Sequence, residues 1–459
     1  MASAAESDEG MNPITAMNNA NYDRFHKILV LIASLGAFTD VYIIMVLSVS
    51  TFSIVPHFLI TTSAFAFTAS LLFVGSVFGV FIMGKFVDIF GRRIIFVVTL
   101  ALAAIFSILS ALVTTPLELN ILRFSLGFVT GADYPAAMTI IAEFMPTKYR
   151  ARGSSYLWVG FVLGGVVAYI VGYFVYIAIG PIAIEWRIML ASAAVPAMIG
   201  TLLRTKLPES PRWAIEKGKF DLAIDGIRKA SGKIFTREEL EKSRDILFVK
   251  ERIPLKKDYG RYIILIIPIA IATLCFNLIT GALGSLDPTI LSSLGIKKSG
   301  TLLFSGFFMT APLLSTLIIA RTVDYVGRLK WGLIGGGFET ICSLLVVSVF
   351  HNTAALMGVV FGIWFFAFLA IPIMNNAGSE MFPTEFRGFS SGIVMGGNRV
   401  SSVIGILITP ILFAGNDVFR LFTVYAIIGL IGTVMVLITF YKKKVDRISL
   451  EDIEHEIMT

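Results

Sequence analysis

Four charged residues lie deep inside long apolar segments of this chain of 459 residues, namely Asp40, Arg123, Asp133 and Arg399. A fifth, Glu339, lies in a further apolar segment. A charged side chain at the centre of a membrane-spanning helix costs about 2.5–3.5 kcal/mol on insertion scales. Each of these residues therefore needs a partner of opposite charge or a function. A carboxyl group can carry a proton, and a guanidinium group can bind an anion.

The two aspartates and Arg123 indicate proton chemistry. Asp40 is in the middle of its apolar segment, where removal from water favours the protonated form of a carboxylate. Arg123, Gly127 and Tyr134 share one helix face, so we predict that Arg123 pairs with Asp40 and that the pair breaks on protonation. We expect Asp133 at the depth of Asp40, where two carboxylates share a proton. The alternative is a structural ion pair for Asp40 and a satisfied buried acid for Asp133.

Among these residues, Arg399 says most about the chemical class of a substrate. It is a lone cation at mid-segment, and a guanidinium matches carboxylate or phosphate in a two-pronged geometry. We therefore predict that it binds an anion, the alternative being a structural pair with Glu339 or Asp133. The polar and aromatic residues expected around it form an amphipathic site: Tyr134, Asn398, Asn277, Asn375 or Asn376, Tyr42, Trp158, Trp364 and Phe338.

The composition predicts that a membrane holds these residues in place. The chain is 56% hydrophobic and only 15% charged, whereas a soluble domain carries roughly a quarter charged residues. Twelve apolar stretches are long enough to cross a hydrocarbon core of ~30 Å. They cover 27–50, 64–87, 94–115, 118–142, 153–176, 187–205, 261–286, 300–321, 331–351, 354–380, 388–413 and 417–441.

The distribution of basic residues predicts the orientation. Most of the Lys and Arg residues lie in the tails and in the segments after even-numbered stretches, whereas Arg187, Lys297, Lys298 and Arg420 lie on the opposite side. Basic loops stay in the cytoplasm, so we expect both termini there and a multi-pass protein of the plasma membrane. The polar N-terminal stretch 1–23 has no signal-peptide pattern, and we expect a disordered cytoplasmic tail.

Two motifs occur twice, which indicates that the chain consists of duplicated halves. The first is Gly84-Lys-Phe-Val-Asp88-Ile-Phe-Gly91-Arg92, with a second copy at Asp324, Gly327 and Arg328. The other runs from Glu143 to Arg150, with a second copy from Glu380 to Arg387. The offset from Asp88 to Asp324 equals, within one residue, that from Glu143 to Glu380. Two unrelated motifs in the same register are strong evidence for duplication.

The first motif resembles the loop signature of the major facilitator superfamily. The second, together with Pro208-Glu-Ser-Pro-Arg-Trp213, is similar to the sugar-porter and organic-ion branches. The resemblance covers nearly the whole chain. It implies an all-α membrane protein with twelve transmembrane helices in two pseudo-symmetric six-helix bundles. It also implies that the repeated residues are gate elements: Gly84, Asp88, Gly91, Arg92, Asp324, Gly327, Arg328, Glu143, Arg150, Glu380 and Arg387. The alternative is that they serve only fold stability and topology.

The resemblance also bears on the substrate. Asp40 looks like the aspartate of the first helix in proton symporters, and Gly131-Ala-Asp133-Tyr134-Pro135 resembles a stretch of phosphate symporters. Arg399 stands where sugar porters carry Trp, phosphate symporters Lys, and aromatic-acid and organic-anion transporters Arg. Val159 stands where phosphate symporters carry Gln, and the paired Gln residues of sugar porters are absent beside Asn277. These differences favour a small organic anion.

We therefore predict a proton-coupled symporter of a small organic anion, a carboxylate, that works by alternating access. The alternatives are a phosphate or sugar:proton symporter, a uniporter or exporter, and a non-transporting receptor. No nucleophile–base set supports an enzyme, and we expect no cofactor, no metal, no nucleic acid and a monomer. The expected parts are the tail 1–26, a bundle at 27–206, a helical linker at 207–259, a bundle at 260–441 and the tail 442–459. The linker is either a cytoplasmic cap on the gate or a solvated connection.

Overall fold

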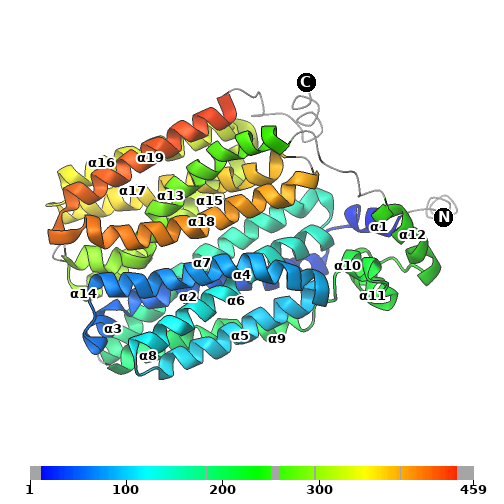
Figure 1. Ribbon diagram of the computed structural model, residues 1–459, viewed down its shortest axis with the longest axis horizontal. Helices are drawn as coiled ribbons and strands as arrows, with labels where there is room; N and C mark the ends of the chain where they lie inside the picture. The colour runs from blue at the N-terminus through cyan, green and yellow to red at the C-terminus, as the bar shows by residue number, and fades with distance from the viewer. Residues whose placement is uncertain (1–11, 181–182, 250–258, 294–295, 383, 442–459) are drawn as a thin grey trace.

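The computed structural model describes residues 12–180, 183–249, 259–293, 296–382 and 384–441. These residues form two bundles of long helices that lie side by side (Figure 1). The first bundle comprises α2 (Arg24–Val49), α3 (Thr51–Phe58), α4 (Thr62–Phe90), α5 (Arg92–Leu112), α6 (Pro116–Phe144), α7 (Arg150–Ile179), α8 (Ala183–Ser192) and α9 (Ala194–Arg204). The second comprises α13 (Tyr259–Ser293), α14 (Lys298–Phe308), α15 (Thr310–Val326), α16 (Arg328–Val349), α17 (Thr353–Glu380), α18 (Thr384–Leu412) and α19 (Val418–Tyr441).

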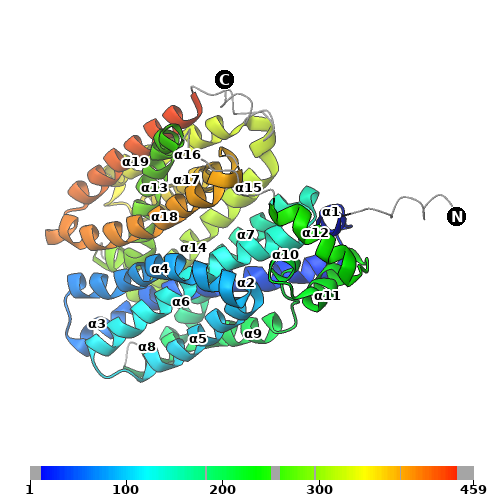
Figure 2. The same ribbon diagram turned by 45° about the vertical axis from the view of Figure 1, so that its right-hand side comes forward.

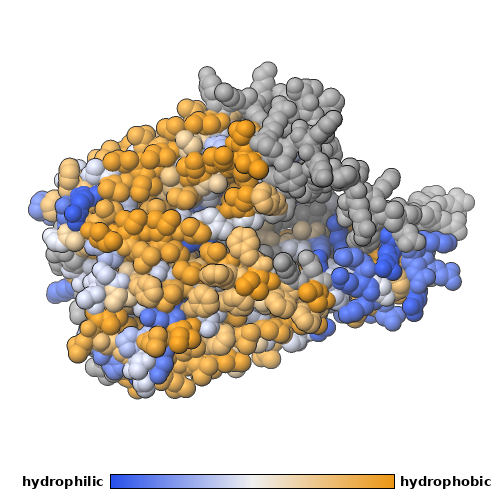
Figure 3. All heavy atoms as spheres, viewed as in Figure 1, coloured by the Kyte–Doolittle hydropathy of each residue, from blue (hydrophilic) through white to orange (hydrophobic). Residues whose placement is uncertain are grey.

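The predicted all-α membrane architecture is confirmed. Within the described ranges, eleven helices are long and apolar enough to cross a membrane. α6, with 29 residues, is the remaining long helix of the first bundle and packs against α4 and α5. Large apolar side chains such as Phe174 and Ile411 are about two-thirds exposed on the outside of the bundles. Figure 3 shows that hydrophobic residues cover the visible side of the bundles, which suits contact with lipid.

Short helices mark one end of the molecule, which we name the linker end. It carries α1 (Pro13–Asn18), α10 (Pro211–Glu216), α11 (Phe220–Ser231) and α12 (Arg237–Val249), whereas α3 and α14 lie at the opposite, far end (Figures 1 and 2). Hydrophilic residues gather over these linker helices (Figure 3). The linker end is therefore a polar cap on an apolar body.

The linker helices are docked rather than merely solvated. Trp213, Phe220 and Ile227 are buried in one apolar cluster with residues from α2 and α6. A capping box opens α12, since Glu239 accepts the Thr236 N–H at 2.7 Å and Thr236 accepts the Glu239 N–H at 3.3 Å. The linker helices are therefore part of the folded first half.

The prediction of a disordered N-terminal tail is wrong for the part that the structure describes. The side chain of Asn12 caps α1 by accepting the N–H of Ile14 at 2.9 Å. Met17 is 1% exposed and joins the apolar cluster of the linker helices. The tail is held because this short helix buries apolar side chains against α11. Residues 1–11 and 442–459 lie outside the described residues.

The duplication is visible in backbone geometry. Gly91 joins α4 to α5 with φ 106° and ψ 157°, and Gly327 joins α15 to α16 with φ 96° and ψ 153°. This region of positive φ is essentially restricted to glycine. The two copies of the loop motif therefore make the same turn at equivalent places in the two halves.

We expect Gly91→Ala to lower the free energy of unfolding by about 1–3 kcal/mol, the cost of forcing a side chain into this backbone region. The added Cβ would also meet the carboxylate of Glu209. Thermal unfolding of the purified protein in detergent measures the effect. Gly337→Ala is the matched control, because a Cβ at Gly337 meets no atom within 4 Å. Equal stability of the two variants would contradict the strain argument.

Glycines also let helices of one half approach each other closely. A Cβ on Gly127 of α6 would overlap the Leu72 backbone of α4, and one on Gly75 of α4 would overlap the Phe124 carbonyl of α6. Small residues at such contacts are typical of helices packed in lipid. This packing gives Arg123 and Asp133 of α6 fixed positions in the first half.

Candidate functional site

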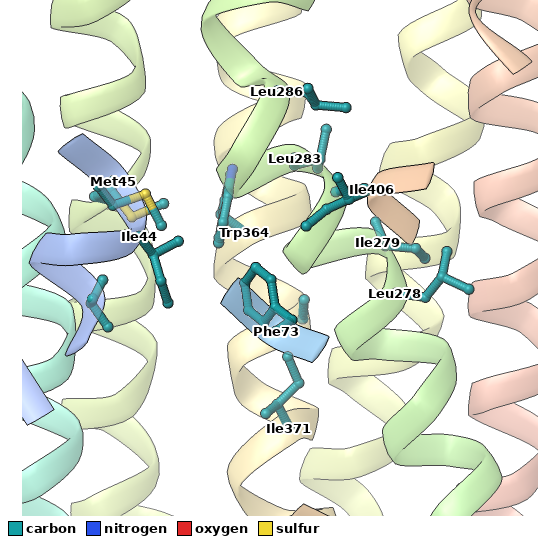
Figure 4. Close-up of a cluster of buried hydrophobic side chains, with 14 of the residues drawn as sticks. Ile44, Met45, Phe73, Leu278, Ile279, Leu283, Leu286, Trp364, Ile371 and Ile406 are labelled. Carbon is teal, nitrogen blue, oxygen red and sulfur yellow. The ribbon is translucent and has the colours of Figure 1, made fainter. Parts of the chain in front are cut away.

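A cavity of about 130 Å³ lies between the two halves, near the middle of the long helices. The first half contributes residues of α2, α4, α6 and α7, and the second half contributes residues of α13, α17 and α18. Its walls are Val41, Ile44, Met45, Phe73, Val80, Gly131, Trp158, Phe161, Asn277, Thr280, Gly281, Gly284, Trp364, Phe368, Ile371, Met395, Asn398, Arg399 and Ser402. Figure 4 shows Trp364 between labelled residues of α13 and of α2. The cavity is mostly apolar, with one cation and a few amide and hydroxyl groups.

The one cationic wall residue, Arg399 of α18, forms an ion pair across the two halves. Its Nη2 donates to Oδ2 of Asp40 on α2 at 2.8 Å. The Asp40 side chain is 3% exposed and that of Arg399 is 16% exposed. Oδ1 of Asp40 has no hydrogen-bond partner among the described residues. The guanidinium also lies 6.0 Å from the centre of the Phe73 ring. This ion pair therefore retains free acceptor capacity next to the cavity.

The prediction that Arg123 pairs with Asp40 is wrong in this structure. Arg123 is 2% exposed, and its Nη1 donates to the backbone carbonyl of Ile43 at 3.0 Å. Its contact is thus with the backbone of α2, one turn beyond Asp40. The depth of Arg123 follows from the sequence, but the rotation of α6 about its axis does not.

The prediction that Asp133 shares a proton with Asp40 is also wrong in this structure. Asp133 forms a two-pronged ion pair with Arg204 of α9, with Nη2 to Oδ2 at 2.8 Å, and accepts a hydrogen bond from Thr99 at 2.8 Å. Arg204 is fully buried and packs on the Phe96 ring. The alternative interpretation, a satisfied buried acid, therefore holds for Asp133.

Three asparagines form a chain of side-chain hydrogen bonds in the second half. Asn277 of α13 donates to Asn398 of α18 at 3.1 Å, and Asn398 donates to Asn375 of α17 at 3.0 Å. The Nδ2 of Asn375 is buried without a partner among the described residues. Asn277 and Asn398 also line the cavity. Asn277, Asn398 and Asn375 thus come together next to Arg399, whereas Asn376 is exposed.

The predicted aromatic residues separate into two groups. Trp158 and Trp364 line the cavity. Tyr42 does not, because its hydroxyl lies 2.9 Å from the Ser192 hydroxyl in the first half. Phe338 is 48% exposed and lies on the outer surface. The prediction that Tyr42 and Phe338 line the site is therefore wrong in this structure. Tyr134 is in α6, and its side chain lies outside the described residues.

A polar network lies at the linker end, where the gate residues were predicted. Arg92 Nε lies 3.6 Å from Glu143 Oε1. Glu209, two residues before the start of α10, accepts the backbone N–H of Arg93 at 3.0 Å. Gly327 and Arg328 join α15 to α16 in the other half. The remaining predicted gate residues have side chains outside the described residues: Gly84, Asp88, Arg150, Asp324, Glu380 and Arg387.

Two buried charged residues were not predicted from the sequence to lie inside the protein. Arg204 is counted as a loop residue because it stands at the end of a stretch, but it is buried against Asp133. Asp287 lies just beyond the stretch 261–286, yet α13 continues to Ser293 and buries it at 2% exposure. Pro288, which follows Asp287, suggests an end of the helix, although α13 continues past it.

Glu339 is buried between α16 and α19 and contacts neither Arg399 nor the cavity.

The site holds no arrangement typical of metal binding. Within the searched residues, no group of three or more His, Cys, Asp or Glu side chains is placed to hold a metal ion. The cavity walls offer a guanidinium, amides, hydroxyls and aromatic rings. These groups bind and orient a small polar molecule.

Comparison with known proteins agrees with this geometry. Residues 11–456 match the family described as "Sugar (and other) transporter". The chain is 26% identical to the putative metabolite transport protein YaaU of Escherichia coli (strain K12), over 92% of this chain and 93% of that protein. It is 29% identical to the arabinose-proton symporter of Bacillus subtilis (strain 168), over 71% and 72% of the two chains.

Solved structures show the same fold. The proton:xylose symporter XylE, of the major facilitator superfamily, superimposes with a TM-score of 0.74 at 21% identity. The match covers 94% of this chain and 98% of that one. The match therefore extends over both halves of the chain, in each of which a glycine makes the same turn. The chain therefore belongs to the Sugar (and other) transporter family, and it is a membrane transporter with the major facilitator fold rather than an enzyme.

Proposed function

We propose that this transporter is a proton-coupled symporter of a small organic anion, with its linker end in the cytoplasm of the cell. The observation that carries the proposal is the ion pair between Arg399, which lines the cavity, and Asp40, which lies behind it in the other half. A buried cation needs a negative partner. Arg399 has one partner in the protein and could exchange it for a substrate carboxylate.

Protonation of Asp40 drives that exchange. A neutral Asp40 no longer compensates the buried guanidinium, so Arg399 is free to bind a carboxylate in the cavity. The hydroxyl or carbonyl groups of the substrate meet Asn277 and Asn398, and its apolar part packs on Trp158 and Trp364. When the substrate leaves, Asp40 releases its proton and pairs with Arg399 again. Proton and anion therefore cross together as the halves rock about the midplane.

The charges balance in this scheme. The empty site contains Asp40 and Arg399 with a net charge of zero. The loaded site contains a neutral Asp40, the guanidinium and one carboxylate, again with a net charge of zero. Exchange of one partner for the other thus never leaves an uncompensated charge in the low-dielectric interior. Symport of a monoanion with one proton is electroneutral.

A neutral sugar is the second candidate. The chain of three asparagines is well suited to hydroxyl groups, and relatives include the arabinose-proton symporter and a D-xylose transporter of Levilactobacillus brevis. A sugar leaves the charge of a transported proton uncompensated. Sugar symport is therefore electrogenic, which separates it from the first candidate.

Proton entry into proteoliposomes with a trapped pH dye tests the two candidates. Small carboxylates, aromatic acids, phosphate and sugars are added in turn, at zero membrane potential and at an inside-negative potassium diffusion potential. We expect a carboxylate to acidify the lumen at a rate that the potential does not change. Acidification by a sugar, accelerated by the potential, would select the second candidate. Flux of labelled substrate without proton entry would make the protein a uniporter.

We expect Asp40→Asn to reduce proton entry at least about tenfold, because an amide takes up no proton. Exchange of labelled substrate across the membrane should persist, since Arg399 stays available to the anion. Both assays use the same proteoliposomes. Asp225→Asn is the matched control, because Asp225 lies on the exposed face of α11. Unimpaired proton entry in Asp40→Asn would remove this residue from the proton route.

A further inference from the structure

A second buried carboxylate lies outside the mechanism above, at the far end of the molecule. Asp287 of α13 is 2% exposed and lies seven residues beyond Thr280 of the cavity wall, which is about 10 Å along a helix. Its Oδ2 accepts a hydrogen bond from Trp364 Nε1 at 3.3 Å. Trp364 also lines the cavity. Asp287 is thus hydrogen-bonded to a residue of the cavity wall.

We propose that Asp287 is a second proton-binding residue of this transporter, part of the gate that closes the far end, and that this gate opens when Asp287 ionises. The far-end gate consists of Ser48 and Tyr169 from the first half and of Asp287 and Trp364 from the second. The proposal concerns the opening of the protein without substrate, and it does not rest on Asp40 or on the identity of the substrate.

The surroundings of Asp287 contain no compensating charge. Among the described residues, no Lys, Arg or His forms an ion pair with it. The titratable groups that face it are the hydroxyls of Tyr169 on α7 and Tyr425 on α19. A buried ionised carboxylate with a single neutral donor is costly, whereas a protonated one is not. The closed far end therefore holds Asp287 in its protonated form.

The two halves close directly over this carboxyl group. Tyr169 of the first half is held by its own half, since its hydroxyl lies 3.3 Å from the Ser48 hydroxyl. Across the halves, a Cβ on Gly306 of α14 would lie 3.1 Å from Tyr169 Cβ. Near the cavity, a Cβ on Gly284 would lie 3.2 Å from Met45 Cε of the first half. In Figure 4, the nitrogen end of the Trp364 ring is directed toward the Leu286 end of α13. Separation of the halves at this end would bring water to Asp287.

A pocket at the far end contains four hydroxyl groups and includes Thr289, a neighbour of Asp287 in the chain. A cavity of about 300 Å³ is lined in part by Thr51, Thr62, Thr289 and Ser292. Thr289 is two residues from Asp287, and its hydroxyl is buried without a partner among the described residues. In the proposed orientation this pocket faces the cell exterior. A proton taken up there would neutralise Asp287 and allow the far end to close.

Distance measurements between two spin labels test the proposal in the absence of substrate and of any gradient. Ser63 of α4 and Lys297, which caps α14, lie at the far end in opposite halves and are replaced by labelled cysteines. The native Cys275 and Cys342 are replaced by alanine. Pulsed electron paramagnetic resonance then records the distance distribution in nanodiscs from acidic to alkaline pH. Nitroxide labels do not titrate in this range.

We expect the wild-type distances to shift from a short to a long population as the pH rises. Asp287→Asn should keep the short population at every pH, because an amide is neutral and preserves the contact with Trp364. Asp287→Glu should retain the pH response, and Asp40→Asn should retain it too. A pH response of Asp287→Asn equal to that of the wild type would overturn the proposal, as would a wild-type distance that never changes with pH. Loss of the response in Asp40→Asn alone would assign the switch to Asp40 instead.

Discussion

Proton uptake driven by an organic acid is expected to fall about 30-fold to 4,000-fold in Arg399→Ala. Truncating one partner of a buried, hydrogen-bonded charge pair costs about 2–5 kcal/mol, and each 1.4 kcal/mol corresponds to a factor of ten. Without the guanidinium, the cavity loses its cation and Asp40 is left buried without its charged partner. Dye-reported proton entry into proteoliposomes measures the loss.

Two further variants separate binding from folding in this experiment. Arg399→Lys retains the charge but not the two-pronged geometry, so we expect partial activity with a higher KM. Arg399→Ala combined with Asp40→Asn removes both charges and should restore thermal stability without restoring proton uptake. Full activity of Arg399→Ala would show that this arginine has only a structural role, and the sugar candidate would then be preferred.

The buried pair in the first half should have the largest effect on stability. Arg204→Met leaves Asp133 buried without its cation, and breaking a buried pair in this way costs about 3–5 kcal/mol. Thermal unfolding in detergent measures the loss. The side chain of Thr99 remains as a donor to Asp133 but supplies no charge.

The double variant Arg204→Met/Asp133→Leu is the control for this second prediction. Replacing a buried ion pair by apolar side chains of similar size is often neutral or stabilising, so the double variant should recover most of the lost stability. A single variant as stable as the wild type would contradict the burial of Arg204. A double variant as unstable as the single one would show that packing, rather than charge, sets the cost.

The sequence predicts the helical architecture well because the periodic signals are strong. Two unrelated motifs in one register predict the duplicated halves, and the matching φ and ψ angles of Gly91 and Gly327 confirm the equivalence. The local pattern Thr236–Arg–Glu–Glu239 likewise forms a capping box at the start of α12. Local patterns of this kind depend on neighbours in the chain, which a sequence displays directly.

The pairing of charges could not be predicted in the same way. Counting residues gives the depth of Asp40 and Arg123 in the membrane but not the rotation of each helix about its axis. The two ion pairs therefore follow from tertiary packing, in which Arg399 reaches Asp40 and Arg204 reaches Asp133. Arg204 also stands at the end of an apolar stretch, where the boundary is uncertain by several residues.

The distance along the chain between the partners of each ion pair has a consequence for how the protein is made. Asp133 meets Arg204 after 71 residues, within the first half, whereas Asp40 meets Arg399 only after 359 residues. At a synthesis rate of roughly 5–20 residues per second, 359 residues take about 20 to 70 s. During biogenesis, the ion pair between Asp133 and Arg204 can form as soon as the first half is synthesised. Asp40 lacks its cationic partner in the membrane until α18, which carries Arg399, has been translated. A factor that shields the open side of the first half, or a proton on Asp40, would protect the nascent chain during that interval.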